Sequence, residues 1–231
     1  MMNGKRQNIL DENQVDWKQF ESIGVTREML EKSNNLIPLL NYENTSLIDI
    51  TVKVGENIPF RTDARLSLTH DFQNDNKLMM KIHAIRKLPE FDKPYFGFKF
   101  TDEDKENILT TGNLGRIATI QHPVWKDQSK VYISIDKQTN ELYCVRTDKI
   151  TVPEYYSGTR LTAKQQQLLE AGKPVYVDGM IAKNGEKVSA HIQVNAYTRY
   201  IDVNPTDVNK TQNNKQISKP DKQKKSQGHK I

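Results

Sequence analysis

The sequence predicts an α+β fold, in which a small N-terminal domain of short helices and a β-hairpin precedes two related units of a helix and an antiparallel sheet. Three observations lead to this fold class. Apolar residues with helical spacing fill residues 15–40, alternating apolar residues begin at Ile48, and one motif occurs twice between Gly97 and Gly172. The expected divisions are a flexible leader at 1–12, an N-terminal domain at 13–92, a repeated domain at 93–203 and a disordered Lys-rich tail at 204–231.

The N-terminal domain is expected to begin with three short helical segments. Val15 to Ile23 predicts a helix ended by Gly24, and Thr26 is a suitable N-cap for a second helix at 27–33. Pro38 breaks the third segment. The second helix is balanced in charge and lacks the Asn, Gln and Arg cluster of a base-reading helix, so packing is favoured over DNA recognition.

Period-two alternation then predicts strands. One strand covers 48–54, and a β-hairpin joins 65–69 to 78–85 through a polar turn at 73–76. In the second arm of this hairpin, His83 shares a face with Lys81 and Ile85. We therefore expect His83 to be an exposed strand residue.

The repeat defines the third part of the chain, with units at 94–152 and 153–203. Gly97 and Gly158 are 61 residues apart, and so are Thr101 and Thr162, which are both suitable N-caps. In each unit a tight turn precedes the capped helix, which is closed by Gly112 or Gly172. In the first unit, strands are expected after the helix at 116–120, 131–135 and 142–145, with an edge strand at 150–152. In the second unit, they are expected at 175–181 and 188–194, and a last strand is expected to begin at Tyr197. The Asn184-Gly185 pair predicts a two-residue hairpin turn with positive φ at both positions.

Charge is distributed unevenly along the chain. The net charge is +5, and residues 204–231, with seven Lys and two Asp, also carry +5, so residues 1–203 hold 27 basic and 27 acidic side chains. The feature that favours a polyanionic partner is therefore the tail. A single cysteine, Cys144, excludes an intramolecular disulfide and fits a reducing cytoplasm. No apolar stretch is long enough for a membrane span, so no membrane partner is expected.

Four segments carry a resemblance to a known family. They are Arg65–Leu68, Gly112–Arg116, Ile133–Asp136 with Thr139–Leu142, and Gly179-Met180 with Gln193–Ala196. They resemble an uncharacterised domain family of conjugative transposons and mobile elements of gut Bacteroidetes, sometimes fused to type-three topoisomerases or primase-like proteins. Residues 17 to 88 are similar to the companion domain that often precedes it. The resemblance implies a role in processing or maintaining mobile DNA and implies no catalytic residue. The family pattern has glycine after Arg199, where this chain has Tyr200.

The motifs that suggest chemistry have simpler structural interpretations. Gly112 and Gly115 match the G-x-x-G loop of KH domains, but they follow a helix and precede a strand, so capping is favoured. Residues 136–141 offer oxygen ligands for Ca²⁺ or Mg²⁺, yet a hairpin turn explains each of them. Cys144 is expected to be a buried, inert thiol. We expect no metal, no cofactor and no enzymatic activity.

The aromatic residues leave two interpretations open. Tyr132, Tyr143, Tyr176 and Tyr197 lie on strands, where they either stack on single-stranded bases or pack in the core, and packing is favoured.

The leading hypothesis is a non-catalytic accessory protein of a mobile element that associates with DNA or RNA. The alternative is an adaptor that docks a topoisomerase- or relaxase-like DNA-processing partner, and an undiscovered enzyme ranks third. Candidate nucleic-acid contacts are Lys219, Lys222, Lys224, Lys225, Arg116, Arg146 and Tyr132.

Overall fold

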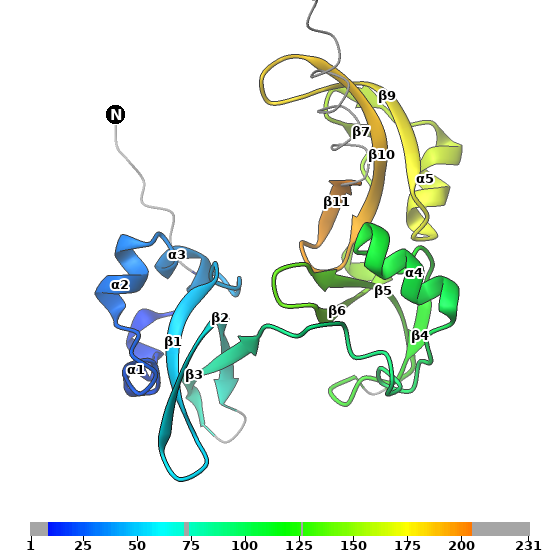
Figure 1. Ribbon diagram of the computed structural model, residues 1–231. Helices are drawn as coiled ribbons and strands as arrows, with labels where there is room; N and C mark the ends of the chain where they lie inside the picture. The colour runs from blue at the N-terminus through cyan, green and yellow to red at the C-terminus, as the bar shows by residue number, and fades with distance from the viewer. Residues whose placement is uncertain (1–8, 72–73, 126, 205–231) are drawn as a thin grey trace, which may run out of the picture. The chain divides into compact units, whose positions relative to one another are not determined.

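The computed structural model describes residues 9–71, 74–125 and 127–204. These residues belong to two compact units (Figure 1). Unit 1 contains the chain up to Pro89 together with Asp136–Glu141, and unit 2 contains the chain from Glu90 to Ile135 and from Leu142 onward. Both units combine helices with antiparallel sheets, which confirms the α+β fold class.

Unit 1 begins with short helical segments, as the apolar spacing predicts. Their bounds are η1 Glu12–Gln14, α1 Trp17–Glu21, α2 Arg27–Lys32 and α3 Leu36–Leu39. The Thr26 hydroxyl accepts a hydrogen bond from the Met29 amide at 3.3 Å and caps α2. The prediction that Pro38 breaks the third segment was wrong, since Pro38 lies inside α3. A proline is tolerated there because the first amides of a helix have no intrahelical partner.

The sheet of unit 1 has the order β1-β2-β3 and is antiparallel throughout. Its strands are β1 Ile48–Val54, β2 Ile58–Asp71 and β3 Asn74–Ala84. The strand β2 is longer than predicted, because it pairs with β1 from Ile58 to Ala64 and with β3 from Ala64 onward. One long strand thus builds two hairpins.

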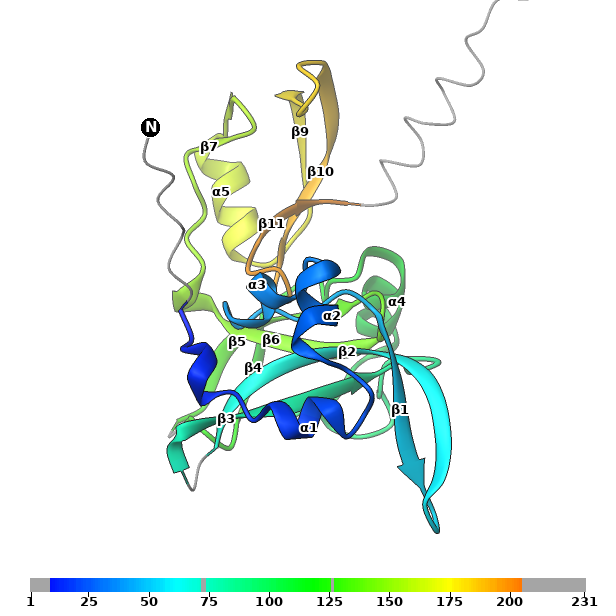
Figure 2. The same ribbon diagram turned by 90° about the vertical axis from the view of Figure 1, so that its left-hand side faces the viewer.

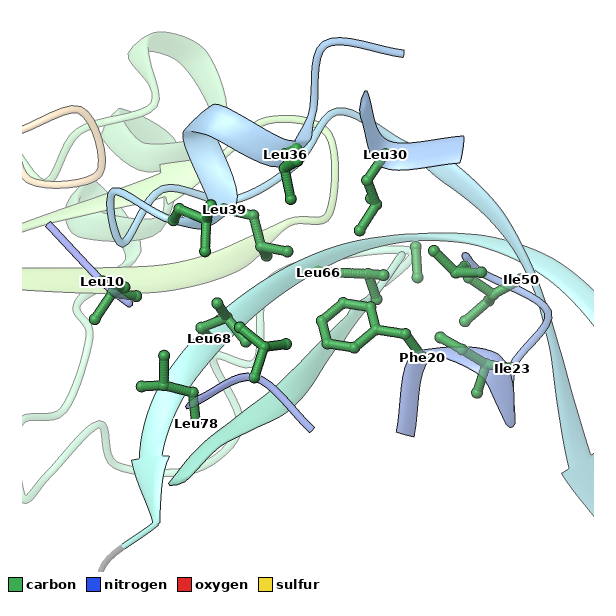
Figure 3. Close-up of a cluster of buried hydrophobic side chains, with 14 residues drawn as sticks. Leu10, Phe20, Ile23, Leu30, Leu36, Leu39, Ile50, Leu66, Leu68 and Leu78 are labelled. Atoms are coloured by element: carbon green, nitrogen blue, oxygen red, sulfur yellow. The ribbon is translucent and has the colours of Figure 1, made fainter. Parts of the chain in front are cut away.

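The core of unit 1 lies between the helices and one face of this sheet (Figure 3). Phe20 and Leu39 from the helices are fully buried, and they point toward Leu66 and Leu68 of β2. Each such side chain contributes roughly 1.5–3 kcal/mol when it is removed from water. Leu10 also packs here at 5% exposure, and its amide donates to the Leu40 carbonyl at 3.0 Å. The leader predicted for 1–12 therefore extends too far, while residues 1–8 lie outside the described residues.

Apart from residues 136–141, the two predicted repeats lie in unit 2, and in each of them a helix precedes three strands. The first has α4 Asp102–Thr111, β4 Ala118–Ile120, β5 Ser129–Asp136 and β6 Glu141–Arg146, followed by η2 Thr147–Lys149. The second has the short hairpin β7 Tyr155–Tyr156 and β8 Thr159–Arg160, then α5 Ala163–Glu170, β9 Val175–Ile181, β10 Lys187–Asn195 and β11 Tyr200–Val203. In each sheet, the second of the three consecutive strands lies between the other two, in the orders β4-β5-β6 and β9-β10-β11.

The start of each repeat has the same local geometry. Phe96 and Gly97 have φ of 49° and 87°, and Ser157 and Gly158 have φ of 45° and 79°. Two successive positive φ values define a type I′ turn, which explains the glycine at the second position of each. Each turn leads to a helix that opens with a capping box, formed by Thr101 with Asp104 and by Thr162 with Gln165. These features confirm the predicted repeat.

A buried chain of polar groups joins the two repeats. The Ser134 hydroxyl donates to the Asn113 side-chain oxygen at 2.7 Å and accepts from the Ala196 amide at 2.8 Å. Asn113 donates to Gln193 at 3.3 Å, and Gln193 donates to the Gly172 carbonyl at 2.8 Å. Ser134, Asn113 and Gln193 are all buried, so this network satisfies polar groups that water does not reach.

Three expectations for the strands of unit 2 were wrong. Residues 150–152 form no strand after η2, since Ile150 and Val152 pack against the core of the second repeat. The last strand begins at Tyr200 and not at Tyr197, because residues 196–199 form a turn. The side chain of Asn195, the last residue of β10, accepts from the Tyr197 amide at 2.9 Å. At the β9–β10 turn, Gly185 has φ of 81° while Asn184 is not among the residues with positive φ. The Ala182 amide bonds to the Glu186 carbonyl, so the loop has three residues and needs one left-handed position.

Candidate functional site

The predicted nucleic-acid contacts fall in two parts of the chain. Lys219, Lys222, Lys224 and Lys225 lie outside the described residues. The other three, Arg116, Arg146 and Tyr132, are in unit 2 and their environments can be described. Each of the three is engaged in contacts within the protein.

Arg116 is bound to the first turn of α4. Its Nε and Nη2 atoms each donate to Asp104 at 2.8 Å, and its guanidinium lies 5.0 Å from the centre of the Phe98 ring. Burial alone would raise the pKa of Asp104, but hydrogen bonds from Arg116 and from the Thr101 amide lower it below its ordinary value. Because Asp104 is also the N3 residue of the capping box, this ion pair fixes the start of α4. Much of the charge of Arg116 is compensated by this carboxylate.

Arg146 has a comparable partner at the end of β6. Its guanidinium donates to both oxygens of Asp148, at 3.0 and 2.9 Å. Both side chains are partly exposed, 43% for Arg146 and 52% for Asp148. This bidentate pair compensates part of the charge of Arg146 at the surface.

Tyr132 lies in the core, as the packing interpretation predicts. It is 4% exposed, and its hydroxyl donates to the Glu170 carbonyl at 2.8 Å. Burial, together with the nearby Glu170, raises the pKa of Tyr132 above its ordinary value. A ring in this position is not available to stack on a base. Arg116, Arg146 and Tyr132 therefore do not form a shared aromatic and basic surface.

Unit 1 contains a cluster of polar side chains that sequence reasoning missed. The strand register places Arg65 and Ser67 of β2 on the same face as Lys81 and His83 of β3, opposite the helices. The segment Asp136–Glu141, which belongs to unit 1, contacts this face. The cluster, defined as Arg65, Ser67, His83, Asp136 and Glu141, is hereafter the polar cluster.

Three contacts hold the polar cluster together. Arg65 donates to Asp136 at 2.9 Å, and their side chains are 12% and 2% exposed. His83 is hydrogen-bonded through Nε2 to the Ser67 hydroxyl at 2.8 Å and through Nδ1 to Glu141. The expectation that His83 is exposed was wrong: it is 3% exposed because the segment Asp136–Glu141 lies over it.

The charge of Glu141 depends on this environment. Burial would raise the pKa of Glu141, but the hydrogen bond with His83 and the charges of His83, Lys81 and Arg86 lower it to about 2. Glu141 is therefore ionised at neutral pH, and its carboxylate stabilises the segment that carries it. The hairpin-turn interpretation of residues 136–141 fits this geometry, since Asp136 accepts from the Gln138 amide at 3.0 Å and from the Thr139 hydroxyl at 3.1 Å.

Ser67, His83 and Glu141 have the connectivity of a nucleophile, a base and an orienting carboxylate. Two features argue against nucleophilic catalysis. Ser67 is only 9% exposed. It is paired with Lys81 in the middle of the β2–β3 ladder, where backbone amides form the hydrogen bonds of the sheet and do not form an oxyanion hole. The arrangement is suited to holding the segment Asp136–Glu141 on the sheet.

Other candidate groups have structural roles in the described residues. Gly112 has φ of 91° and is the left-handed cap of α4, which confirms the capping interpretation. Cys144 is partly buried, and burial raises the pKa of its thiol, as expected for an inert cysteine. Within residues 9–71, 74–125 and 127–204, no group of three or more His, Cys, Asp or Glu side chains is placed to hold a metal ion, and no helix is long and apolar enough to cross a membrane.

Comparison with known families assigns two parts of the chain. Residues 10–94 match the family described as protein of unknown function DUF4099, and residues 153–203 match the family described as protein of unknown function DUF3945. Two parts of this chain are thus similar to domains of unknown function. The DUF4099 match covers the helices and the sheet of unit 1, and the DUF3945 match covers the second repeat. No curated protein and no solved structure matched the chain.

Proposed function

We propose that this protein is a non-catalytic accessory protein of a mobile genetic element, and that it binds DNA or RNA through its Lys-rich segment at 204–231. The distribution of charge carries the proposal. The segment has seven Lys and two Asp, and its +5 equals the net charge of the whole chain. Residues 1–203 are balanced, with 27 basic and 27 acidic side chains.

Electrostatics explains what such a segment would do. Lysines that neutralise phosphates release condensed counterions, so binding is independent of sequence and weakens steeply as salt concentration rises. The described residues support the same proposal, because Arg116 and Arg146 are both paired with carboxylates and Tyr132 is buried. The segment is thus the strongest candidate for the polyanion contact.

The mobile-element context rests on the family resemblance. The matches to DUF4099 and DUF3945 support membership of uncharacterised domain families and name no activity. A protein that associates with nucleic acid without catalysis fits the absence of a recognisable catalytic motif in the sequence. The proposal therefore assigns a binding role and no reaction.

The direct test compares the full chain with a variant ending at residue 203. Both are titrated onto single-stranded and double-stranded DNA at several salt concentrations. We expect the full chain to bind both at low salt and the shortened chain to bind much more weakly. Failure of the full chain to bind at low salt would make the segment a solubility feature. Equal affinity and equal salt dependence for the two proteins would place the site within residues 1–203.

A protein–protein adaptor is the second candidate, and the balanced charge of residues 1–203 favours it. Several large apolar side chains of unit 1 are also exposed, among them Ile58 and Phe60. Purification of the protein with its partners from its native host, with and without nuclease, separates the two functions. Partners that persist after nuclease favour the adaptor, and partners that are lost with the nucleic acid favour the binding role.

A further inference from the structure

The turn between β9 and β10 carries the dipeptide Asn184-Gly185. Figures 1 and 2 show this turn at the end of the hairpin opposite the turn that leads into β11. Residues 183–187 are all exposed, and a Cβ atom added at Gly185 would meet nothing within 4 Å. The other asparagine that precedes a glycine, Asn3, lies outside the described residues. Within the described ranges, Asn184 is therefore the one asparagine whose following residue has no side chain.

An asparagine in this setting can react with its own backbone. The Gly185 nitrogen loses its proton to hydroxide and forms a bond with Cγ, the side-chain carbonyl carbon of Asn184. The bond between Cγ and Nδ2 then breaks, and the side-chain nitrogen takes a proton from water and leaves as ammonia. The product is a succinimide ring, which water opens at either carbonyl to give aspartate or isoaspartate. A side chain on the attacking residue obstructs this approach, and glycine has none.

The hydrogen bonds of the Asn184 side chain favour this attack. Its Oδ1 accepts from the Glu186 amide at 3.2 Å. This donor polarises the carbonyl, and it lies beside the oxygen on which negative charge develops during the attack. The Nδ2 atom donates to the Glu186 carboxylate at 3.0 Å, so both ends of the side-chain amide are held at the turn.

One contact opposes the attack, and it lies at the surface. The Gly185 amide donates to the Ala182 carbonyl at 2.9 Å, and this bond must open before the nitrogen can attack. The ladder of β9 and β10 begins one residue further on each side, at the pair of Ile181 and Lys187. Exposed hydrogen bonds at the end of a hairpin open locally at a small cost in free energy. The reaction therefore does not require unfolding of the sheet.

We infer that Asn184 is a site of spontaneous deamidation, and that the carboxylate formed there weakens the β9–β10 turn. The reaction consumes only water and removes the Nδ2 donor, so the hydrogen bond to Glu186 is lost and two carboxylates face each other at the turn. The isoaspartate product also adds a methylene to the main chain of a loop whose length sets the hairpin register. The inference is independent of nucleic-acid binding, since it concerns the second repeat and not the segment 204–231.

Peptide mapping by mass spectrometry tests the site. The full chain and a synthetic peptide of residues 180–190 are incubated at mildly alkaline pH and sampled over time. We expect Asn184 of the folded chain to form both products at no less than about a tenth of the rate in the peptide, since only the bond to Ala182 must open. Asn113, which is buried and precedes Leu114, should stay intact. A folded chain in which Asn184 converts more slowly than this, or no faster than Asn113, overturns the inference.

A substitution tests the reaction path. Gly185→Ala adds a methyl group to the attacking residue in open space, and it should slow the conversion of Asn184 several-fold. The rate for the parent chain should rise with pH, because hydroxide removes the proton from the Gly185 nitrogen. A rate that is the same in Gly185→Ala, or that does not depend on pH, contradicts attack by this nitrogen.

Thermal unfolding tests the consequence for the turn. Asn184→Asp reproduces the aspartate product in every molecule and should melt at a lower temperature than the parent chain. Glu186→Gln in the same chain removes the second carboxylate and should restore most of the loss. If Asn184→Asp melts with the parent chain, or if Glu186→Gln restores nothing, the new carboxylate does not weaken the turn in the way inferred.

Discussion

Arg65 and Asp136 are 71 residues apart in the chain, and the guanidinium of one donates to the carboxylate of the other at 2.9 Å. The contact is nearly closed to water, because the two side chains are 12% and 2% exposed. Arg65 also donates to the Thr45 carbonyl at 2.5 Å, so this side chain bridges two segments of unit 1. This pair and the contact between His83 and Glu141 hold the segment Asp136–Glu141 against the sheet of unit 1.

Removing one member of this buried pair should destabilise unit 1 strongly. Arg65→Ala leaves the carboxylate of Asp136 buried without its cation, which typically costs about 3–5 kcal/mol. Arg61→Ala is the matched control, because it breaks a solvent-exposed pair with Asp49 and should destabilise the unit far less. Urea unfolding of both variants measures the difference. Equal losses of stability would show that the Arg65–Asp136 pair has no special role.

The depressed pKa of Glu141 predicts a particular pH dependence. Because the folded-state pKa is about 2 and the ordinary value is 4.5, the stabilisation by ionised Glu141 is fully present above pH 4.5 and is lost as the pH falls toward 2. At pH 7 the Glu141→Gln variant should be less stable than the parent by up to about 3 kcal/mol. The difference in unfolding free energy should shrink as pH falls through this window. A difference that stays constant from neutral to acidic pH contradicts the assigned contact.

Local features of the fold were predictable because their causes are local. The caps Thr101 and Thr162 act on amides three residues away, and the turns before them need positive φ at Gly97 and Gly158. The polar cluster was not predictable, because strand alternation gives the face of His83 and says nothing about what covers that face. His83 contacts Glu141, 58 residues further along the chain. A usable signal was the presence of Arg65 and Ser67 on the face opposite the core.

The predicted site was also limited by long-range contacts. The sequence shows that Arg116, Arg146 and Tyr132 are of the types that bind nucleic acid, but it does not show that Asp104, Asp148 and the Glu170 carbonyl already bind them. Ion pairs of this kind depend on the tertiary arrangement. Net charge is a property of composition, and the assignment of the +5 to residues 204–231 therefore needed no structure.

The β9–β10 turn gives a test of backbone geometry. Gly185 has φ of 81°, and a Cβ atom added there would meet nothing within 4 Å, so any cost of substitution is conformational. Gly185→Val should destabilise the second repeat by about 1–3 kcal/mol, because β-branched residues are strained at positive φ. Gly185→Asn is the control and should cost less, since asparagine tolerates this region. Thermal unfolding of the two variants decides the matter, and equal melting temperatures would argue against the left-handed position.

The proposed function makes its sharpest prediction for a charge substitution within the full chain. Changing Lys219, Lys222, Lys224 and Lys225 to Gln removes four positive charges, whereas changing the same four residues to Arg keeps them. Each phosphate contact on double-stranded DNA contributes about −0.9 to the slope of log affinity against log salt. The Gln variant should therefore bind more weakly at low salt with a shallower slope, and the Arg variant should resemble the parent.

Fluorescence anisotropy titrations of one labelled duplex, repeated across a series of salt concentrations, measure both quantities for the three proteins. We expect the Gln variant to reduce the magnitude of the slope by up to about 3.6 and the Arg variant to leave it nearly unchanged. If all three proteins bind the duplex with the same affinity and the same slope, the segment at 204–231 is not the nucleic-acid contact.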